Sequence, residues 1–133
     1  MKSADHKSKS DNRSLSCEQK LLAVGDSLYA IGGKWKLRIV IALSQGHSRF
    51  NDLVRTIPGI SGKVLSSELK ELEVNGFVNR VVIAESTPVI VEYKLSPYAQ
   101  SLESVVYALI DWGVQHRLKL KEESETLATG ETK

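Results

Sequence analysis

The spacing of apolar residues changes twice along the chain. From Ser16 to Gly76 apolar residues recur every three or four positions, which predicts helices. From Phe77 to Leu95 the period shortens to two, and β-branched and aromatic residues become frequent, which predicts strands. Helical spacing returns after Ser96. The chain is therefore predicted to be an α+β protein with a β-hairpin between helical regions.

Capping and turn residues divide the first helical region. Ser16 is suited to begin one helix, which Gly32-Gly33 ends, and a second follows in "KWKLRIVIALSQG". "HSRF" is too short for a helix and is predicted as a strand, and Asn51 is predicted to cap a third helix, "DLVRTI". The apolar positions of the first two helices are Leu21, Val24, Leu28, Ile31, Trp35, Ile39 and Leu43.

A fourth helix follows a tight turn. Pro58-Gly59 breaks the chain, Ser61 is predicted to cap the next helix, and Asn75-Gly76 is predicted to close it. Two short helices that flank a tight turn form a helix-turn-helix pattern.

The residues of this fourth helix are of two kinds. Leu65, Leu69 and Leu72 recur at i, i+4 and i+7 and are expected to face the core. The polar positions carry small or basic side chains: Lys63, Ser66, Ser67 and Lys70. Lysine and serine bind bases or phosphates in the major groove of DNA, and small side chains let a helix lie deep in it. The alternative is a solvated face.

The alternating segments "FVNRVVI" and "IVEYKL" are predicted to form a hairpin, the wing of a winged helix. The loop between them, "AESTPV", has one acid and no base, so we do not expect an arginine at its tip to enter the minor groove. Ser96 and Pro97 are predicted to begin a long last helix.

The first and last helices carry more apolar surface than one small domain can bury. The predicted architecture is a winged helix-turn-helix with added N- and C-terminal dimerisation helices. Its domain should span residues 15–120, between disordered tails at 1–14 and 121–133. The predicted dimer contacts are Leu21, Leu28, Leu102, Val106, Leu109 and Ile110.

Charge supports a nucleic-acid partner more than composition does. The 133 residues are 41% hydrophobic and 26% charged, as in ordinary globular domains, with a net charge of +2. The segment 34–80 contains eight basic and four acidic residues, a net charge of +4. Basic residues gathered around the fourth helix favour DNA. The alternative is a winged helix that binds another protein without sequence-specific DNA binding.

Other classes of function find little support. No apolar run is long enough to span a bilayer, and a single cysteine cannot form an internal disulfide, so we expect a cytoplasmic protein. "GGKWK" lacks the rest of a phosphate-binding loop, and we find no catalytic triad, so no enzyme and no cofactor are predicted. His6, His47, His116 and Cys17 lack metal-ligand spacing.

Several motifs occur together in a recognisable order. They are "GKW", "RF..L...IPGIS", "LK.LE..G", "VEY.L" and a final tryptophan, between about Cys17 and Trp112. With these motifs the chain resembles HxlR-type winged-helix regulators, relatives of the MarR group. The resemblance implies a homodimeric, DNA-binding transcription factor that reads a pseudo-palindromic operator. The chain departs from the family pattern at Glu18, where proline is frequent, and at Ala99, where glycine is frequent.

The resemblance adds three candidate sites. Arg49, in the "RF" motif, is expected to bind a phosphate or to pair with Asp52 or Glu92. Arg80 on the wing is a further phosphate candidate. Cys17, at a helix start with Lys20 nearby, is either a redox or electrophile sensor or an inert packing residue.

Overall fold

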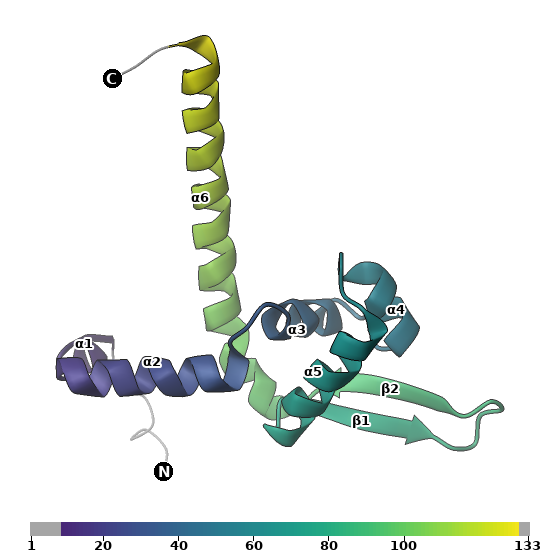
Figure 1. The fold of residues 1–133 in the computed structure, drawn as a ribbon. Helices are drawn as coiled ribbons and strands as arrows, with labels where there is room; N and C mark the ends of the chain where they lie inside the picture. The colour runs from purple at the N-terminus through teal and green to yellow at the C-terminus, as the bar shows by residue number, and fades with distance from the viewer. Residues whose placement is uncertain (1–8, 131–133) are drawn as a thin grey trace.

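The computed structural model describes residues 9–130, and residues 1–8 and 131–133 lie outside the description. Helices and a two-stranded sheet succeed one another in the predicted order, except that α1 is added and the strand predicted at "HSRF" is absent among the described residues (Figure 1). The elements are α1 (Lys9–Arg13), α2 (Cys17–Ile31), α3 (Lys36–Ser44), α4 (Phe50–Thr56), α5 (Gly62–Val74), β1 (Val78–Ile83), β2 (Ile90–Leu95), the 3₁₀ helix η2 (Pro97–Leu102) and α6 (Glu103–Thr129). The winged helix-turn-helix with an added helix at each end is confirmed.

Helix α2 begins with a reciprocal cap. The Ser16 hydroxyl accepts a hydrogen bond from the backbone N–H of Gln19 at 3.1 Å, and the Gln19 side chain accepts one from the backbone N–H of Ser16 at 2.9 Å. The helix ends at Gly32, as predicted. Only Ile31 at its last turn is buried, so α2 joins the rest of the chain at one end.

The core lies where α3, α4, α5, the base of the sheet and the start of α6 meet. Its innermost side chains are Ile39, Leu53, Leu65, Leu69, Leu72 and Val78. The predicted apolar face of the fourth helix is therefore confirmed as the face of α5 that packs on the core. Helix α4 begins at Phe50 after Arg49, without a side-chain cap, so the prediction that Asn51 caps it is wrong.

Strands β1 and β2 pair antiparallel from Val78 opposite Leu95 to Ile83 opposite Ile90, which confirms the wing. The predicted strand at "HSRF" is absent from the described residues. Its only trace is a hydrogen bond of 2.8 Å from the backbone N–H of Tyr93 to the carbonyl of Ser48. This single backbone bond does not extend the sheet, and the side chains of Arg49 and Glu92 also approach each other between the segment and β2.

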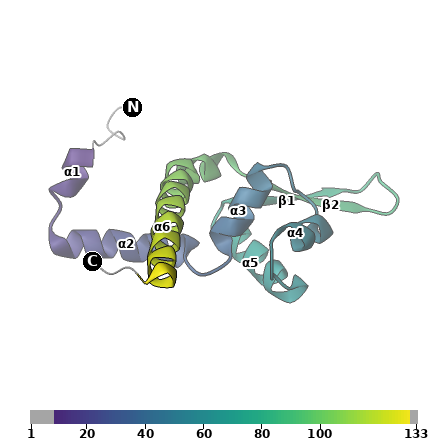
Figure 2. The ribbon, with the colours of Figure 1, turned by 90° about the horizontal axis from the view of Figure 1, so that it is seen from above.

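The segment after the wing starts as a 3₁₀ helix and continues as α6. Ser96 accepts a hydrogen bond from the backbone N–H of Ala99, and Pro97 follows at the first position, as expected for a helix start. Figures 1 and 2 show that α2 and α6 diverge from the winged-helix body in different directions. Neither is covered by the body along most of its length.

The predicted tails require correction. Helix α6 continues to Thr129, so residues 121–129 are helical rather than disordered. Lys9–Arg13 form α1, which lies inside the predicted N-terminal tail. Residues 1–8, including His6, and residues 131–133 fall outside the described residues.

Candidate nucleic-acid interface

Helix α5 presents a continuous polar face to solvent. The Ser61 hydroxyl accepts a hydrogen bond from the backbone N–H of Val64 at 3.1 Å and caps the helix. At 100° per residue, four exposed side chains lie on the side opposite the buried leucines. They are Lys63, Ser66, Ser67 and Lys70, and we call this set the reading face. It lies on the second helix of the helix-turn-helix, which enters the major groove in proteins of this architecture.

The basic side chains of this region are not neutralised within the chain. Among residues 9–130, Lys63, Lys70 and Arg80 have no ion-pair partner. Arg80 is exposed on β1, opposite Tyr93 in the hairpin register. Exposed, unpaired cations are available to phosphates, whose neutralisation supplies most of the affinity in nonspecific DNA binding.

A buried lysine joins α3 to the middle of α5. The Nζ atom of Lys36 lies 2.7 Å from Oε1 of Glu68 and 2.7 Å from Oε1 of Glu71, and its side chain is 9% exposed. Burial alone would lower the pKa of Lys36, but the hydrogen bonds and charges of the two carboxylates outweigh burial and raise it. No sequence signal connects residues 32 positions apart.

Arg49 lies at the N-terminus of α4, and its Nε atom is 3.8 Å from Oε2 of Glu92 on β2. The ion pair with Glu92, which was predicted as an alternative to a phosphate contact, is therefore present in the structure. Because the side chain of Arg49 is 56% exposed and the contact is long, the pairing is weak. A phosphate contact by Arg49 stays a prediction.

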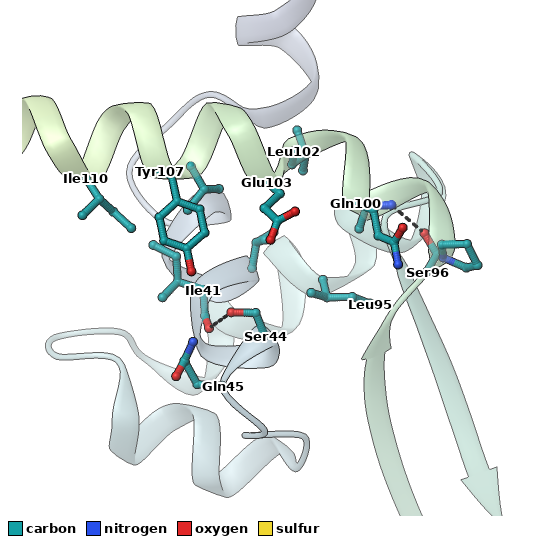
Figure 3. Close-up of a pocket in the computed structure, with 14 residues that line it drawn as sticks. Ile41, Ser44, Gln45, Leu95, Ser96, Gln100, Leu102, Glu103, Tyr107 and Ile110 are labelled. Atoms are coloured by element: carbon teal, nitrogen blue, oxygen red, sulfur yellow. Dashed lines mark hydrogen bonds between the residues drawn. The ribbon is translucent and has the colours of Figure 1, made fainter.

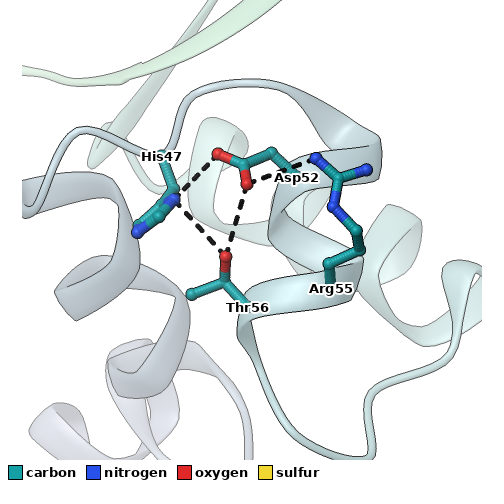
Figure 4. A network of polar contacts seen from close by, with 4 residues as sticks. All are labelled: His47, Asp52, Arg55 and Thr56. Atoms are coloured by element: carbon teal, nitrogen blue, oxygen red, sulfur yellow. Dashed lines mark hydrogen bonds and ion pairs between the residues drawn. The ribbon is translucent and has the colours of Figure 1, made fainter.

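A polar network connects the turn after α3 to α4 (Figure 4). Nδ1 of His47 lies 2.8 Å from Oδ2 of Asp52, and the Thr56 hydroxyl donates to Oδ1 of Asp52 at 3.4 Å. Arg55 approaches the same oxygen at 3.5 Å. The hydrogen bond with His47 is the main reason that the pKa of Asp52 is lowered. The network fixes the first helix of the helix-turn-helix beside α3.

The terminal helices expose most of their apolar side chains. Leu21 and Leu28 on α2, and Leu109 and Ile110 on α6, are exposed, as a dimer interface requires. Leu102 and Val106, also predicted as dimer contacts, are only 6% and 8% exposed because they pack in the core of their own chain. We therefore correct their assignment to the core.

Cys17 is the first residue of α2 and is exposed. In the single chain it is therefore not a buried packing residue. Its neighbour Ser16 supplies the helix cap, and Lys20 follows within the same turn. The position combines access to solvent with the apolar surface of α2.

A groove of about 590 Å³ lies between α3, the end of β2 and the start of α6. In Figure 3, Ile41, Ser44 and Gln45 line one side, and Tyr107 and Ile110 of α6 lie across from them. The groove separates the winged-helix body from α6. No sequence signal marked it, because its walls come from segments far apart along the chain.

Other kinds of site find no support within the described residues. No group of three His, Cys, Asp or Glu side chains is placed to hold a metal ion. No helix in the described part of the chain is long and apolar enough to cross a membrane.

The HxlR-like helix-turn-helix family model matches residues 30–121, which contain α3 to α5, the wing and most of α6. The chain belongs to the HxlR-like helix-turn-helix family. It is 42% identical over 95 residues to YtcD of Bacillus subtilis (strain 168), an uncharacterized HTH-type transcriptional regulator, covering 71% of this chain and 75% of YtcD. The family resemblance inferred from the motifs is thereby confirmed.

Solved structures of related proteins include redox regulators. The redox regulator HypR in its reduced form matches with a TM-score of 0.68 and 36% identity, covering 75% of this chain and 98% of HypR. The diamide-treated form of YodB from B. subtilis matches with a TM-score of 0.59 and 32% identity, covering 77% and 95%. The HxlR-like fold of this chain is thus shared with proteins studied in two redox states.

Proposed function

We propose that the protein is a cytoplasmic, homodimeric transcriptional regulator that reads a pseudo-palindromic DNA operator with two copies of α5. The reading face carries this proposal. Its four side chains are exposed, its two lysines have no ion-pair partner among residues 9–130, and its leucine face is fixed in the core. Membership of a helix-turn-helix family of regulators supports the same conclusion, which assigns binding rather than catalysis.

Dimerisation gives the proposed regulator its geometry. The exposed apolar side chains of α2 and α6 need a cover, and a second copy of the chain would supply one. Two α5 helices would then enter successive major grooves about 34 Å apart, or a multiple of that distance. Any event that shifts α2 or α6 would change this spacing and so the affinity for the operator.

The test of the reading face is a titration of DNA binding at several salt concentrations. An operator is first selected from random DNA, and wild type, Lys63→Ala, Lys70→Ala and the double variant are compared on it and on a scrambled sequence. If a lysine binds a phosphate, its replacement should reduce the slope of log affinity against log salt concentration by about 1, without changing the preference for the operator over the scrambled sequence. If a lysine binds a base, its replacement should relax the sequence preference at one operator position and cost about 1–3 kcal/mol of binding free energy.

Lys121→Ala on α6 is the matched control, because it removes the same charge far from α5 along the chain. Unchanged binding by the double variant would remove α5 from the reading role. Failure of the wild type to select any operator would favour a winged helix that binds proteins instead.

A second candidate function is regulation by thiol oxidation. Its specific support is the exposed Cys17 at the start of α2, together with the likeness of the chain to HypR and YodB. A modification there would act on a proposed dimer helix and so on the spacing of the two reading helices.

A further inference from the structure

Helices α3 and α5 contact each other in two ways, and the contact made by Lys36 is the polar one. The two helices otherwise meet through buried apolar side chains such as Ile39, Leu65 and Leu69. Apolar contacts are nondirectional, so a helix that rests on them alone can rotate by small angles at low cost. Hydrogen bonds between charged groups are short and directional.

Lys36 supplies two such bonds from one buried ammonium group. Its Nζ atom lies 2.7 Å from a carboxylate oxygen of each of Glu68 and Glu71, which are three residues apart on α5. Because α3 is held by its own buried side chains, the ammonium is a fixed point against which α5 is oriented. We propose that Lys36 is a positioning residue for DNA reading, which fixes the rotation of α5 about its own axis.

The link to recognition follows from the order of residues along α5. Glu68 directly follows Ser67, and Glu71 directly follows Lys70, so each carboxylate held by Lys36 is adjacent in sequence to a member of the reading face. Rotation of the helix would move all four side chains of the reading face together. Base recognition depends on alignment with specific edges, whereas phosphate attraction tolerates small shifts. Loss of Lys36 should therefore reduce specificity more than general DNA affinity.

The contacts of Lys36 also separate the acidic residues of α5 from its basic ones. Glu68 and Glu71 form ion pairs with Lys36 inside the chain, whereas Lys63 and Lys70 have no ion-pair partner among the described residues. Without Lys36, two uncompensated carboxylates would lie on the helix that approaches phosphates. An effect on DNA binding thus has two sources, charge and rotation, and the variants below separate them.

This inference rests on the proposed function, and its test uses the full chain. We would compare wild type, Lys36→Met and the triple variant K36M/E68Q/E71Q, which replaces the whole cluster with uncharged groups of similar shape. Lys34→Met is the matched control, because it removes a lysine charge two residues away that contacts no carboxylate within the described residues. The readout is the ratio of affinities for the selected operator and for scrambled DNA, measured well below each melting temperature.

We expect Lys36→Met to lower operator affinity about tenfold, the loss typical of one misaligned base contact, and to lower the specificity ratio. The triple variant should regain thermal stability, since neither carboxylate is left without its counter-charge, but keep the lowered ratio. Lys34→Met should keep the wild-type ratio. A wild-type ratio in the triple variant would overturn the proposal and leave Lys36 with a role in stability or charge alone.

The triple variant keeps the proposal testable if Lys36→Met fails to fold. Failure of the proposed function is recognised separately, because the wild type would then select no operator at all. Wild-type operator binding combined with an unchanged ratio in the triple variant would reject only the role of Lys36.

Discussion

At the scale of single residues, Cys17 is the candidate site for the proposed regulation by thiol oxidation. It is exposed at the first position of α2, so an oxidant or a small thiol in solution can reach its sulfur. Because it is the only cysteine, its disulfide partners are Cys17 of a second chain or a small thiol. Either product would add a bond or a group beside the exposed leucines of α2.

We therefore expect diamide with glutathione to release wild-type protein from its operator and to leave Cys17→Ser bound. In that reaction diamide takes up two electrons and two protons, and the thiols of Cys17 and glutathione become a mixed disulfide. The measurement is operator binding by both proteins, with and without treatment. Equal binding in all four samples would assign Cys17 to packing at the edge of α2.

At the scale of elements, the network at the start of α4 makes stability depend on pH. His47, Arg55 and Thr56 surround the carboxylate of Asp52, and the hydrogen bond with His47 contributes most to lowering its pKa. A carboxyl whose pKa is lower in the folded chain stabilises the fold above the usual pKa of aspartate. This stabilisation disappears as the pH falls through the folded value.

Asp52→Asn should therefore melt at a lower temperature than wild type at neutral pH, and the difference should shrink as the pH falls through the lowered pKa of Asp52. Thermal melts across this range, monitored by circular dichroism, provide the measurement. Asp26→Asn is the control, because no ion pair involves Asp26 on α2 within residues 9–130. A difference between Asp52→Asn and wild type that stays constant down to acid pH would contradict the role of the carboxylate charge.

Elements whose signals lie within a few residues were predictable from sequence. The cap at Ser16, the cap at Ser61 and the alternating strands all depend on local spacing, and the structure confirms each of them. The prediction of a strand at "HSRF" was wrong because, among the described residues, the segment makes one backbone hydrogen bond to β2 and no ladder, and its partner lies far along the chain. The polar sequence after residue 120 suggested disorder, but α6 continues through it to Thr129.

The site was predictable to the same local extent. The reading face follows from the period of α5 alone, and all four side chains are exposed as expected. The Lys36 contact with Glu68 and Glu71 needs two helices brought together by the core, so periodicity gave no indication of it. Leu102 and Val106 share an apolar stripe with Leu109, and only packing shows that the stripe divides between core and surface.

At the scale of the whole molecule, the two terminal helices set the geometry of the proposed dimer. Helix α6 has 27 residues, so it extends roughly 40 Å, well beyond the winged-helix body (Figure 1). Beyond the body its apolar side chains are exposed. Trp112 is 65% exposed, and its ring stacks on that of His116 with 4.7 Å between the ring centroids. Exposed apolar surface of this extent is uncommon on a monomer and marks an interface.

Leu109 tests this interface most directly. It lies on the same face of α6 as Trp112 and is 52% exposed, so a glutamate there leaves the core of the single chain intact. In a dimer the same glutamate would bury a charge against apolar side chains, at a cost of several kcal/mol. We expect Leu109→Glu to sediment as a monomer at micromolar concentration. It should also lose operator affinity about 10²-fold or more, because each α5 would bind its half-site alone.

Gln115→Glu is the matched control, since it adds the same charge on the polar strip of α6 between Asp111 and Glu122. That variant should remain dimeric and bind the operator like wild type. Sedimentation of the wild type as a monomer would reject the dimer. If Leu109→Glu stayed dimeric, the interface would have to be formed by α2 or by the other apolar face of α6, which carries Ile110, Val114 and Leu118. The spacing of the two reading helices would then follow from that second arrangement, and a new operator selection would measure it as a changed half-site separation.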